Sequence, residues 1–71
     1  MIKSLTIIFP IFNEESRLEK SLNEVKKFVD TNHGLNLEII FVDDGSADTS
    51  KLIIQNFIKE NDNNIYKYFG E

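Results

Sequence analysis

Three short apolar segments alternate along the chain with two longer segments in which apolar residues recur every three or four positions. The segments "LTIIF" (residues 5–9) and "LEIIFV" (residues 37–42) are rich in β-branched residues and apolar at nearly every position. Such runs are typical of parallel strands that helices cover on both faces of the sheet. A third segment, "IYKYF" (residues 65–69), predicts one more strand.

The two longer segments predict amphipathic helices. The first is expected from about Glu14 to His33, with Asn13 capping its start and Gly34 providing a left-handed cap after its end. The second follows the turn "DDGSADTS". The residues expected on the buried faces are Leu18, Leu22, Val25, Phe28 and Val29 in the first helix and Ile53, Ile54, Phe57 and Ile58 in the second.

This alternation predicts an α/β fold with a Rossmann-like parallel sheet, β-α-β-α-β, and right-handed connections. In such sheets, ligands bind at the carboxyl ends of the strands. The turns "PIFNEE" (residues 10–15) and "VDDGS" (residues 42–46) both fall at that edge. The two turns are therefore the candidate ligand site.

Length and charge narrow the classes of protein. A chain of 71 residues has room for one globular unit, so residues 1–71 are expected to form a single domain or part of one. Twelve acidic against eight basic residues give a formal net charge of -4, which argues against nucleic acid or an anionic membrane as the partner. The chain has no cysteine, which excludes disulfides and thiolate metal ligands. The apolar run near the N-terminus is too short for a signal sequence or a membrane span, which favours the cytoplasm or the cytoplasmic face of a membrane.

Five carboxylates are expected to gather at the carboxyl edge of the sheet: Glu14, Glu15, Asp43, Asp44 and Asp48. Such a cluster repels bare phosphate, and the first turn has no glycine that would let a phosphate approach the backbone. Carboxylates do accept hydrogen bonds from nucleobase N–H groups and ribose hydroxyls, while a divalent metal ion screens the phosphates of a nucleotide. Nucleoside recognition is therefore one interpretation of this edge.

A structural role is the alternative for the same five residues. Glu14, Glu15 and Asp48 also stand where the dipole of a helix favours negative charge. Asp43 and Asp44 equally fit an Asx turn that closes the strand-to-helix connection.

Other residues near the edge have a simple structural interpretation as well. Pro10 is placed where it would end the first strand. The aromatic residues of the third strand are interpreted as strand packing, because the surrounding charge is wrong for stacking on nucleic acid. These residues are Tyr66, Tyr68 and Phe69.

The two segments "LTIIFPIFNEESRL" and "LEIIFVDDGSADTS" together resemble the opening of the family 2 glycosyltransferases, inverting nucleotide-sugar enzymes of GT-A fold. The segments lie about thirty residues apart across one crossover unit, and the pair is far more specific than either alone. Within the family, "NEESRL" looks most like the polyprenyl-phosphate hexosyltransferase branch, typified by dolichyl-phosphate glucosyltransferases. The resemblance implies that the chain is the N-terminal part of a GT-A fold.

The resemblance also implies which residues meet the nucleotide. Asp43 matches the family aspartate that recognises the base, and Phe12 stands where tyrosine is common. The strand would then end in carboxylates because the site reads base and ribose rather than phosphate. The implied nucleotide-binding residues are Pro10, Phe12, Glu14, Asp43, Asp44, Gly45 and Ser46.

For the intact protein, the resemblance implies transfer of a hexose from a uridine or guanosine diphosphate sugar, with a polyprenyl phosphate as the candidate acceptor. The metal-binding Asp-x-Asp segment, which would hold Mg or Mn, and the catalytic base are expected after Glu71. No catalytic or metal-binding residue is therefore expected in this chain, which should be inactive by itself. The apolar first strand would also be open at one edge and prone to self-association.

Two other functions stay open on the sequence. A small non-enzymatic α/β module would bind a nucleotide or a partner through the open edge of its sheet. A receiver-like phospho-acceptor domain would use the acidic strand end "FVDDG", but it needs a further aspartate at the end of a later strand, and only Gly70 and Glu71 follow "IYKYF".

Overall fold

The computed structural model describes residues 3–61 and 64–70. The elements are β1 (Lys3–Ile11), α1 (Glu15–Thr31), β2 (Leu35–Asp43), α2 (Ser50–Glu60) and β3 (Tyr66–Gly70). The three strands form one parallel sheet in the order β1-β2-β3. The α/β class and the parallel β-α-β-α-β arrangement are therefore confirmed.

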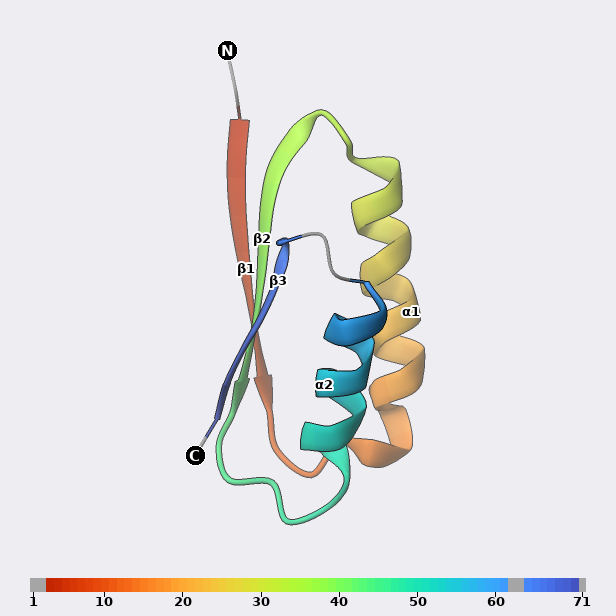
Figure 1. Cartoon of the computed structure of the whole chain (residues 1–71), viewed down its shortest axis with the longest axis vertical. Helices are drawn as coiled ribbons and strands as arrows, with labels where there is room; N and C mark the ends of the chain where they lie inside the picture. The colour runs from red at the N-terminus through yellow and green to blue at the C-terminus, as the bar shows by residue number, and fades with distance from the viewer. Residues whose placement is uncertain (1–2, 62–63, 71) are drawn as a thin grey trace.

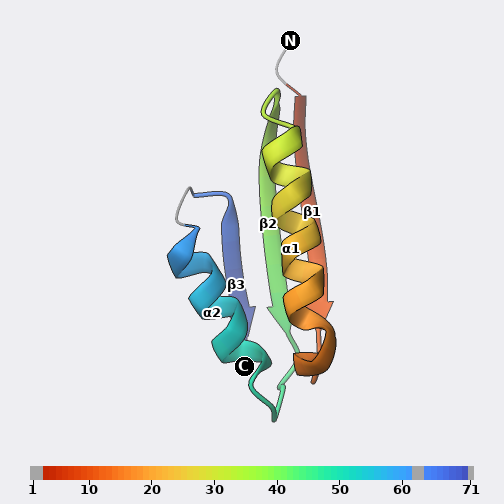
Figure 2. The same cartoon turned by 90° about the vertical axis from the view of Figure 1, so that its right-hand side faces the viewer.

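Both helices lie on the same face of the sheet (Figure 1, Figure 2). Each connection is a right-handed crossover, and because the strand order follows the chain order, both crossovers advance in one direction and bring their helices to one side. The expectation of helices on both faces was wrong for this reason. Neither helix, in the part of the chain that the structure describes, is long and apolar enough to cross a membrane.

The core lies between the helices and the covered face of the sheet. Phe41, in the central strand, is fully buried, and its ring stacks on those of Phe9 and Tyr66 with centroids 5.7 and 6.4 Å away. Phe57 of α2 meets Tyr66 edge to face at 4.9 Å, which ties α2 to the sheet. The buried apolar residues are Ile11, Leu18, Leu22, Val25, Val29, Leu37, Ile39, Phe41, Ile54 and Tyr66.

The opposite face of the sheet is not covered by either helix (Figure 1). In its polar part, Glu38 accepts a hydrogen bond from Thr6 (3.2 Å) and pairs with Lys67 (2.6 Å). Toward the carboxyl ends of the strands, the same face presents Ile8 and Phe69, which are 61% and 58% exposed. The strands carry apolar residues on both faces, as the sequence indicated, but α1 and α2 bury only one of those faces.

Two predicted helix caps are wrong. α1 starts after Glu14, and Asn13 has a φ of 49° and directs its side chain to the second turn instead of to α1. At the other end of α1 the cap is Asn32, whose side-chain amide donates to the carbonyl of Phe28 at 2.7 Å. Because Asn32 bonds the end of the helix, no left-handed residue is needed there, and Gly34 does not have a positive φ.

Pro10 lies inside β1, so the alternative that it ends the strand is wrong. The carbonyl of Ile11 accepts the N–H of Asp44 (3.0 Å) on the β2 side. Backbone groups alternate along a strand, so the Pro10 nitrogen faces the side of β1 that has no neighbouring strand among the described residues. The missing N–H of proline therefore costs no hydrogen bond of the sheet.

Candidate functional site

The two predicted turns meet at one edge of the sheet. Residues 12–14 follow β1 and residues 44–49 follow β2, and both segments run beside the strand tips at the end where the helices begin (Figure 1). This confirms that both turns lie at the carboxyl edge of the parallel sheet, where ligands bind in folds of this class.

Asn13 links the two turns. Its side-chain Oδ1 accepts the N–H of Ala47 at 2.8 Å, and its own N–H donates to the hydroxyl of Ser46 at 3.0 Å. Asparagine tolerates the left-handed backbone that this position adopts. Asn13 thus fixes the spacing between the turns rather than the start of α1.

A second set of hydrogen bonds joins the starts of the two helices. The N–H of Glu14 donates to the hydroxyl of Ser50, which is fully buried, at 2.9 Å. Asp48 accepts the N–H groups of Glu15 (3.2 Å) and Ser50 (2.9 Å), and the carboxylate of Glu15 accepts the N–H of Thr49 (3.2 Å). The hydrogen bond from Ser50 is the largest of the influences that hold the pKa of Asp48 below its usual value. Glu15 lies in the first turn of α1, as its structural alternative expected, whereas Asp48 precedes α2 and is not in its first turn. Both carboxylates have a structural role, which is to join the two turns by hydrogen bonds.

Asp43 ends β2 and is held by two donors. Its side chain is only 4% exposed, with Oδ1 accepting the N–H of Ser46 and Oδ2 accepting the hydroxyl of Tyr68, both at 2.9 Å. Gly45, with a φ of 78°, allows the sharp turn that returns Ser46 to this carboxylate. Burial raises the pKa of Asp43, but the hydrogen bonds from Ser46 and Tyr68 outweigh it and hold this pKa below the usual value. The result is an ionised carboxylate in a fixed orientation.

Tyr68 is the residue at this edge whose role the sequence analysis missed. Burial, and after it the hydrogen bond and charge of Asp43, raise the pKa of Tyr68 to about 12, so the phenol keeps its proton and donates. In the sheet, Tyr68 lies opposite Phe41, and Gly70 lies opposite Asp43. Phe41 and Asp43 are two residues apart on β2, so Tyr68 and Asp43 are on the same face of the sheet. The pairing of residues between β2 and β3 was the signal that could have predicted this contact. The hydrogen bonds of Asn13 and Ser50 depend instead on how the two turns approach each other.

Asp43 and Asp44 line a shallow hollow at the carboxyl ends of β2 and β3. The hollow has a volume of about 280 Å³. Its other lining residues are Val42, Phe69 and Gly70. The hollow is thus lined by one exposed carboxylate, Asp44, and one that is buried and fixed by hydrogen bonds, Asp43.

Pro10 and Glu14 line a different hollow, of about 240 Å³, between β1 and the first turns of α1. There Glu14 pairs with Arg17 at 2.6 Å. Phe12, which stands between Pro10 and Glu14 in the sequence, is 57% exposed, and its ring is therefore open to a stacking partner. The structure thus brings the seven predicted residues to one edge but does not place Pro10 and Glu14 in the same hollow as Asp43.

The acidic edge does not by itself form a metal site. Among residues 3–61 and 64–70, no three histidine, cysteine, aspartate or glutamate side chains are grouped to hold a metal ion. Asp48 and Glu15 already bond to N–H groups of the chain, as described above. The expectation that ligands for Mg or Mn follow Glu71 stays a prediction.

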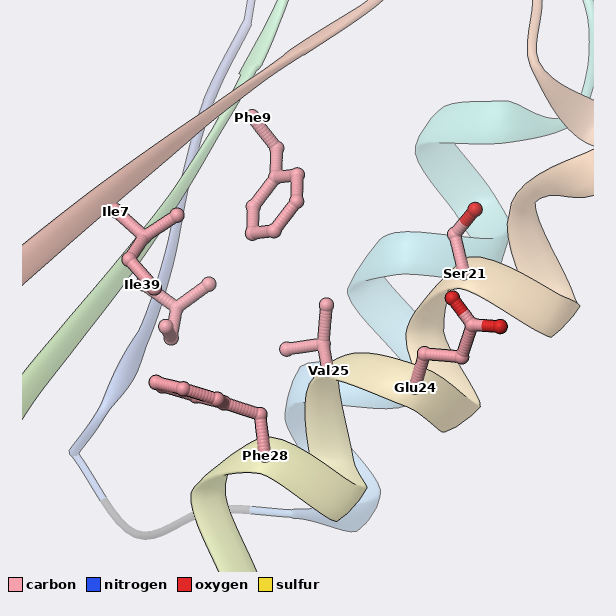
Figure 3. A pocket seen from close by; sticks show the side chains of 7 residues that line it. All are labelled: Ile7, Phe9, Ser21, Glu24, Val25, Phe28 and Ile39. Atoms are coloured by element: carbon pink, nitrogen blue, oxygen red, sulfur yellow. The ribbon is translucent and has the colours of Figure 1, made fainter. Parts of the chain in front are cut away.

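Another groove, of about 310 Å³, lies away from this edge, between β1 and the outer side of α1 (Figure 3). Figure 3 shows Ile7, Phe9 and Ile39 pointing from the sheet toward Val25 and Phe28 of α1. Its polar rim is formed by Ser21 and Glu24. None of the predicted nucleotide-binding residues lines this groove.

The sequence matches a family model described as glycosyl transferase family 2 over residues 6–71. A GalNAc(5)-diNAcBac-PP-undecaprenol beta-1,3-glucosyltransferase of Campylobacter jejuni is 38% identical over 65 residues, which are 92% of this chain and 19% of that protein. Dolichyl-phosphate beta-glucosyltransferases of Trichomonas vaginalis and Dictyostelium discoideum are 35% and 38% identical over 60 residues, or 79% of this chain. No solved structure matches the chain.

The chain spans about a fifth of the length of these relatives. Their names agree with the branch that the segment "NEESRL" suggested. The match also agrees with the fold, because a Rossmann-like parallel β-α-β-α-β unit is consistent with the N-terminal part of a GT-A fold.

Proposed function

The chain belongs to glycosyl transferase family 2, and on that basis we propose that residues 1–71 form the donor-nucleotide-binding part of an inverting glycosyltransferase. The intact protein transfers a hexose from a uridine or guanosine diphosphate sugar. The single observation that carries the proposal is Asp43, an ionised carboxylate that is buried, fixed by two hydrogen bonds and located at the carboxyl edge of a parallel sheet.

Asp43 is suited to recognise a base. A carboxylate has about four lone-pair sites, and Ser46 and Tyr68 use two of those of Asp43. The remaining sites accept an N–H of a nucleobase, either N3–H of uracil or N1–H of guanine. Because Asp43 is already ordered and ionised, its side chain loses little conformational entropy when the base binds.

The neighbouring residues complete the proposed nucleoside site. The exposed ring of Phe12 stacks on the nucleoside, and the carboxylates of Glu14 and Asp44 accept ribose hydroxyls. Gly45 and Ser46 hold the turn beside the base, and Pro10 shapes the adjoining hollow. In the intact protein a divalent metal ion would screen the phosphates, and its ligands are expected after Glu71.

The acceptor that we propose is a polyprenyl phosphate. The relatives named above act on dolichyl phosphate or on an undecaprenol-linked saccharide, by their names. The intact protein would then work at the cytoplasmic face of a membrane, where a lipid acceptor and a nucleotide sugar meet. The chain alone is expected to transfer no sugar, and detectable hexose transfer by the 71-residue chain would contradict this part of the proposal.

Calorimetric titration of the 71-residue chain tests nucleoside recognition. UDP and GDP are compared with inorganic pyrophosphate, which has the phosphates without base or ribose. We expect one nucleoside diphosphate to bind and pyrophosphate to bind far more weakly, and we expect Asp43→Asn to weaken nucleotide binding about tenfold or more. Asp30→Asn, at an exposed position of α1, removes the same charge and serves as the control. Equal losses in the two variants, or pyrophosphate binding as tight as nucleotide binding, would contradict the proposal.

A partner-binding module is the second candidate function. The observation in its favour is the uncovered sheet face, where Ile8 and Phe69 are largely exposed. Sedimentation velocity distinguishes the two candidates: a self-standing module should be a defined monomer or dimer, whereas part of a larger domain should associate without a fixed stoichiometry.

A further inference from the structure

The hydrogen bond between Tyr68 and Asp43 joins two strands at the proposed nucleoside site. The Tyr68 hydroxyl donates to Oδ2 of Asp43 at 2.9 Å, while the N–H of Ser46 occupies Oδ1. The two donors come from different parts of the chain, since Ser46 belongs to the turn after β2 and Tyr68 to β3. Together they restrain both oxygens, so the carboxylate cannot rotate without losing a hydrogen bond.

Gly70 makes room for this arrangement. A Cβ placed on Gly70 would lie 2.2 Å from the hydroxyl oxygen of Tyr68 and 2.6 Å from the ring carbon that carries it. The Tyr68 side chain therefore lies directly over the backbone of Gly70, two residues further along the same strand. Any larger residue at position 70 would move the hydroxyl away from Asp43.

We infer that Tyr68 is a positioning residue of the nucleoside site: its hydroxyl holds the Asp43 carboxylate in the one orientation that receives the N–H edge of a nucleobase. The inference rests on the proposed function, and it adds a residue that does not touch the nucleotide in this role. Tyr68 acts through Asp43, and Gly70 acts through Tyr68.

A packing role alone does not account for this contact. Tyr66, on the same strand and the same face, packs its ring against Phe41 and Phe57 in the core. Tyr68 also packs against the core and is half-buried, but its hydroxyl bonds to the carboxylate that ends the central strand. Tyr68→Phe and Tyr66→Phe are therefore a matched pair of variants: each removes one hydroxyl, and Tyr68→Phe removes the hydrogen bond to Asp43.

The first test compares Tyr68→Phe with Tyr66→Phe by calorimetric titration with UDP and GDP. We expect Tyr68→Phe to weaken binding of the preferred nucleotide about tenfold, since it removes a hydrogen bond to a charged group, and Tyr66→Phe to leave the affinity unchanged. Unchanged or tighter binding by Tyr68→Phe, or equal losses in both variants, overturns the inference. If the wild-type chain binds neither nucleotide, the proposed function itself fails and the inference falls with it.

A methylated nucleotide separates base recognition from a general loss of structure. 3-Methyluridine diphosphate, or 1-methylguanosine diphosphate if GDP is preferred, lacks the N–H that Asp43 would accept. Tyr68→Phe should then change the affinity for the methylated nucleotide by less than twofold. An undiminished tenfold loss with the methylated nucleotide would show that Tyr68 does not act through base recognition, and this overturns the inference.

Two further measurements test the route through Asp43. Gly70→Ala should cause the same loss of affinity as Tyr68→Phe, and the double variant should lose little more than either one, because both remove a single hydrogen bond. Titration of the Asp43 carboxyl carbon by NMR, without nucleotide, should show a higher pKa in Tyr68→Phe but not in Tyr66→Phe. Additive losses, or an Asp43 pKa that does not move, overturn the inference.

Discussion

Two acidic pairs lie at the same edge of the sheet and look alike in the sequence, yet the fold uses them differently. Glu15 and Asp48, the holding pair, accept backbone N–H groups across the gap between the two turns. Asp43 and Asp44, for which we propose nucleoside recognition, line the hollow at the carboxyl ends of β2 and β3. Acidic residues at a strand edge therefore do not identify a binding site by number alone. What separates the pairs is that Glu15 and Asp48 join the two turns, whereas Asp43 and Asp44 line the hollow.

The largest expected effect is on nucleotide affinity, and it tests whether the two pairs differ in function. Asp43→Ala should lower the affinity for UDP or GDP about thirtyfold, because it removes a charged acceptor of the base. Asp48→Ala should lower the affinity much less, because Asp48 joins the two turns and does not line the hollow beside Asp43. Calorimetry on both variants, after circular dichroism has shown that they are folded, measures the difference. Equal losses would mean that the two pairs do not differ in function.

The next prediction concerns the bonds that hold the turns together. Ser50→Ala should lower the free energy of unfolding by about 1–2 kcal/mol, because it leaves the N–H of Glu14 without its buried acceptor. Ser16→Ala, at an exposed position in the first turn of α1, is the control and should change stability by less than about 0.5 kcal/mol. Urea denaturation of the two variants measures both values. A Ser50→Ala variant with the same free energy of unfolding as wild type would show that this hydrogen bond contributes little to stability.

Acid should weaken the hydrogen bonds of Asp43 and of Asp48, one member of each pair, through the same linkage. The pKa values of Asp43 and Asp48 are held below the usual 3.8, so the ionised carboxylates stabilise the folded state at neutral pH. This stabilisation is fully present above the unfolded pKa values and is lost as the pH falls through the folded ones. Urea denaturation between pH 7 and pH 2.5 should show stability declining below about pH 4, and Asp43→Asn and Asp48→Asn should each flatten the decline. Stability that rises on acidification in this range would contradict the assignment.

The smallest effect on stability is expected for substitutions on the uncovered face of the sheet, which carries none of the four carboxylates. The double substitution Ile8→Ser and Phe69→Ser should leave the free energy of unfolding within about 0.5 kcal/mol of wild type, because both side chains are already largely exposed. Sedimentation velocity should show less self-association in this variant, because the exposed apolar surface is smaller. Unchanged self-association would mean that the copies of the chain do not meet through this face.

The local patterns of the sequence predicted much of the fold. Helical periodicity identified the residues of α1 and α2 that face the core, although Ile53, Phe57 and Ile58 are only partly buried. Phe28 is exposed at the margin of the groove. Apolar runs identified three strands: the observed β1 and β2 extend the predicted ranges by one or two residues at each end, and β3 is shifted by one residue. The caps were less predictable, because Asn13 and Gly34 have more than one common use. Asn13 was assigned to the nearest helix, whereas its partner lies in a turn more than thirty residues away.

The sequence by itself determined the order of the elements, the parallel sheet and the position of Asp43 at a strand end, because these follow from periodicity within short segments. Only the tertiary structure decided which face of the sheet the helices cover, because that depends on the direction of two successive crossovers. It also decided that Asp48 holds a turn while Asp43 receives the hydroxyl of Tyr68, 25 positions later in the chain. Such contacts are set by strand register and by the approach of two turns, neither of which is encoded in the neighbouring residues alone.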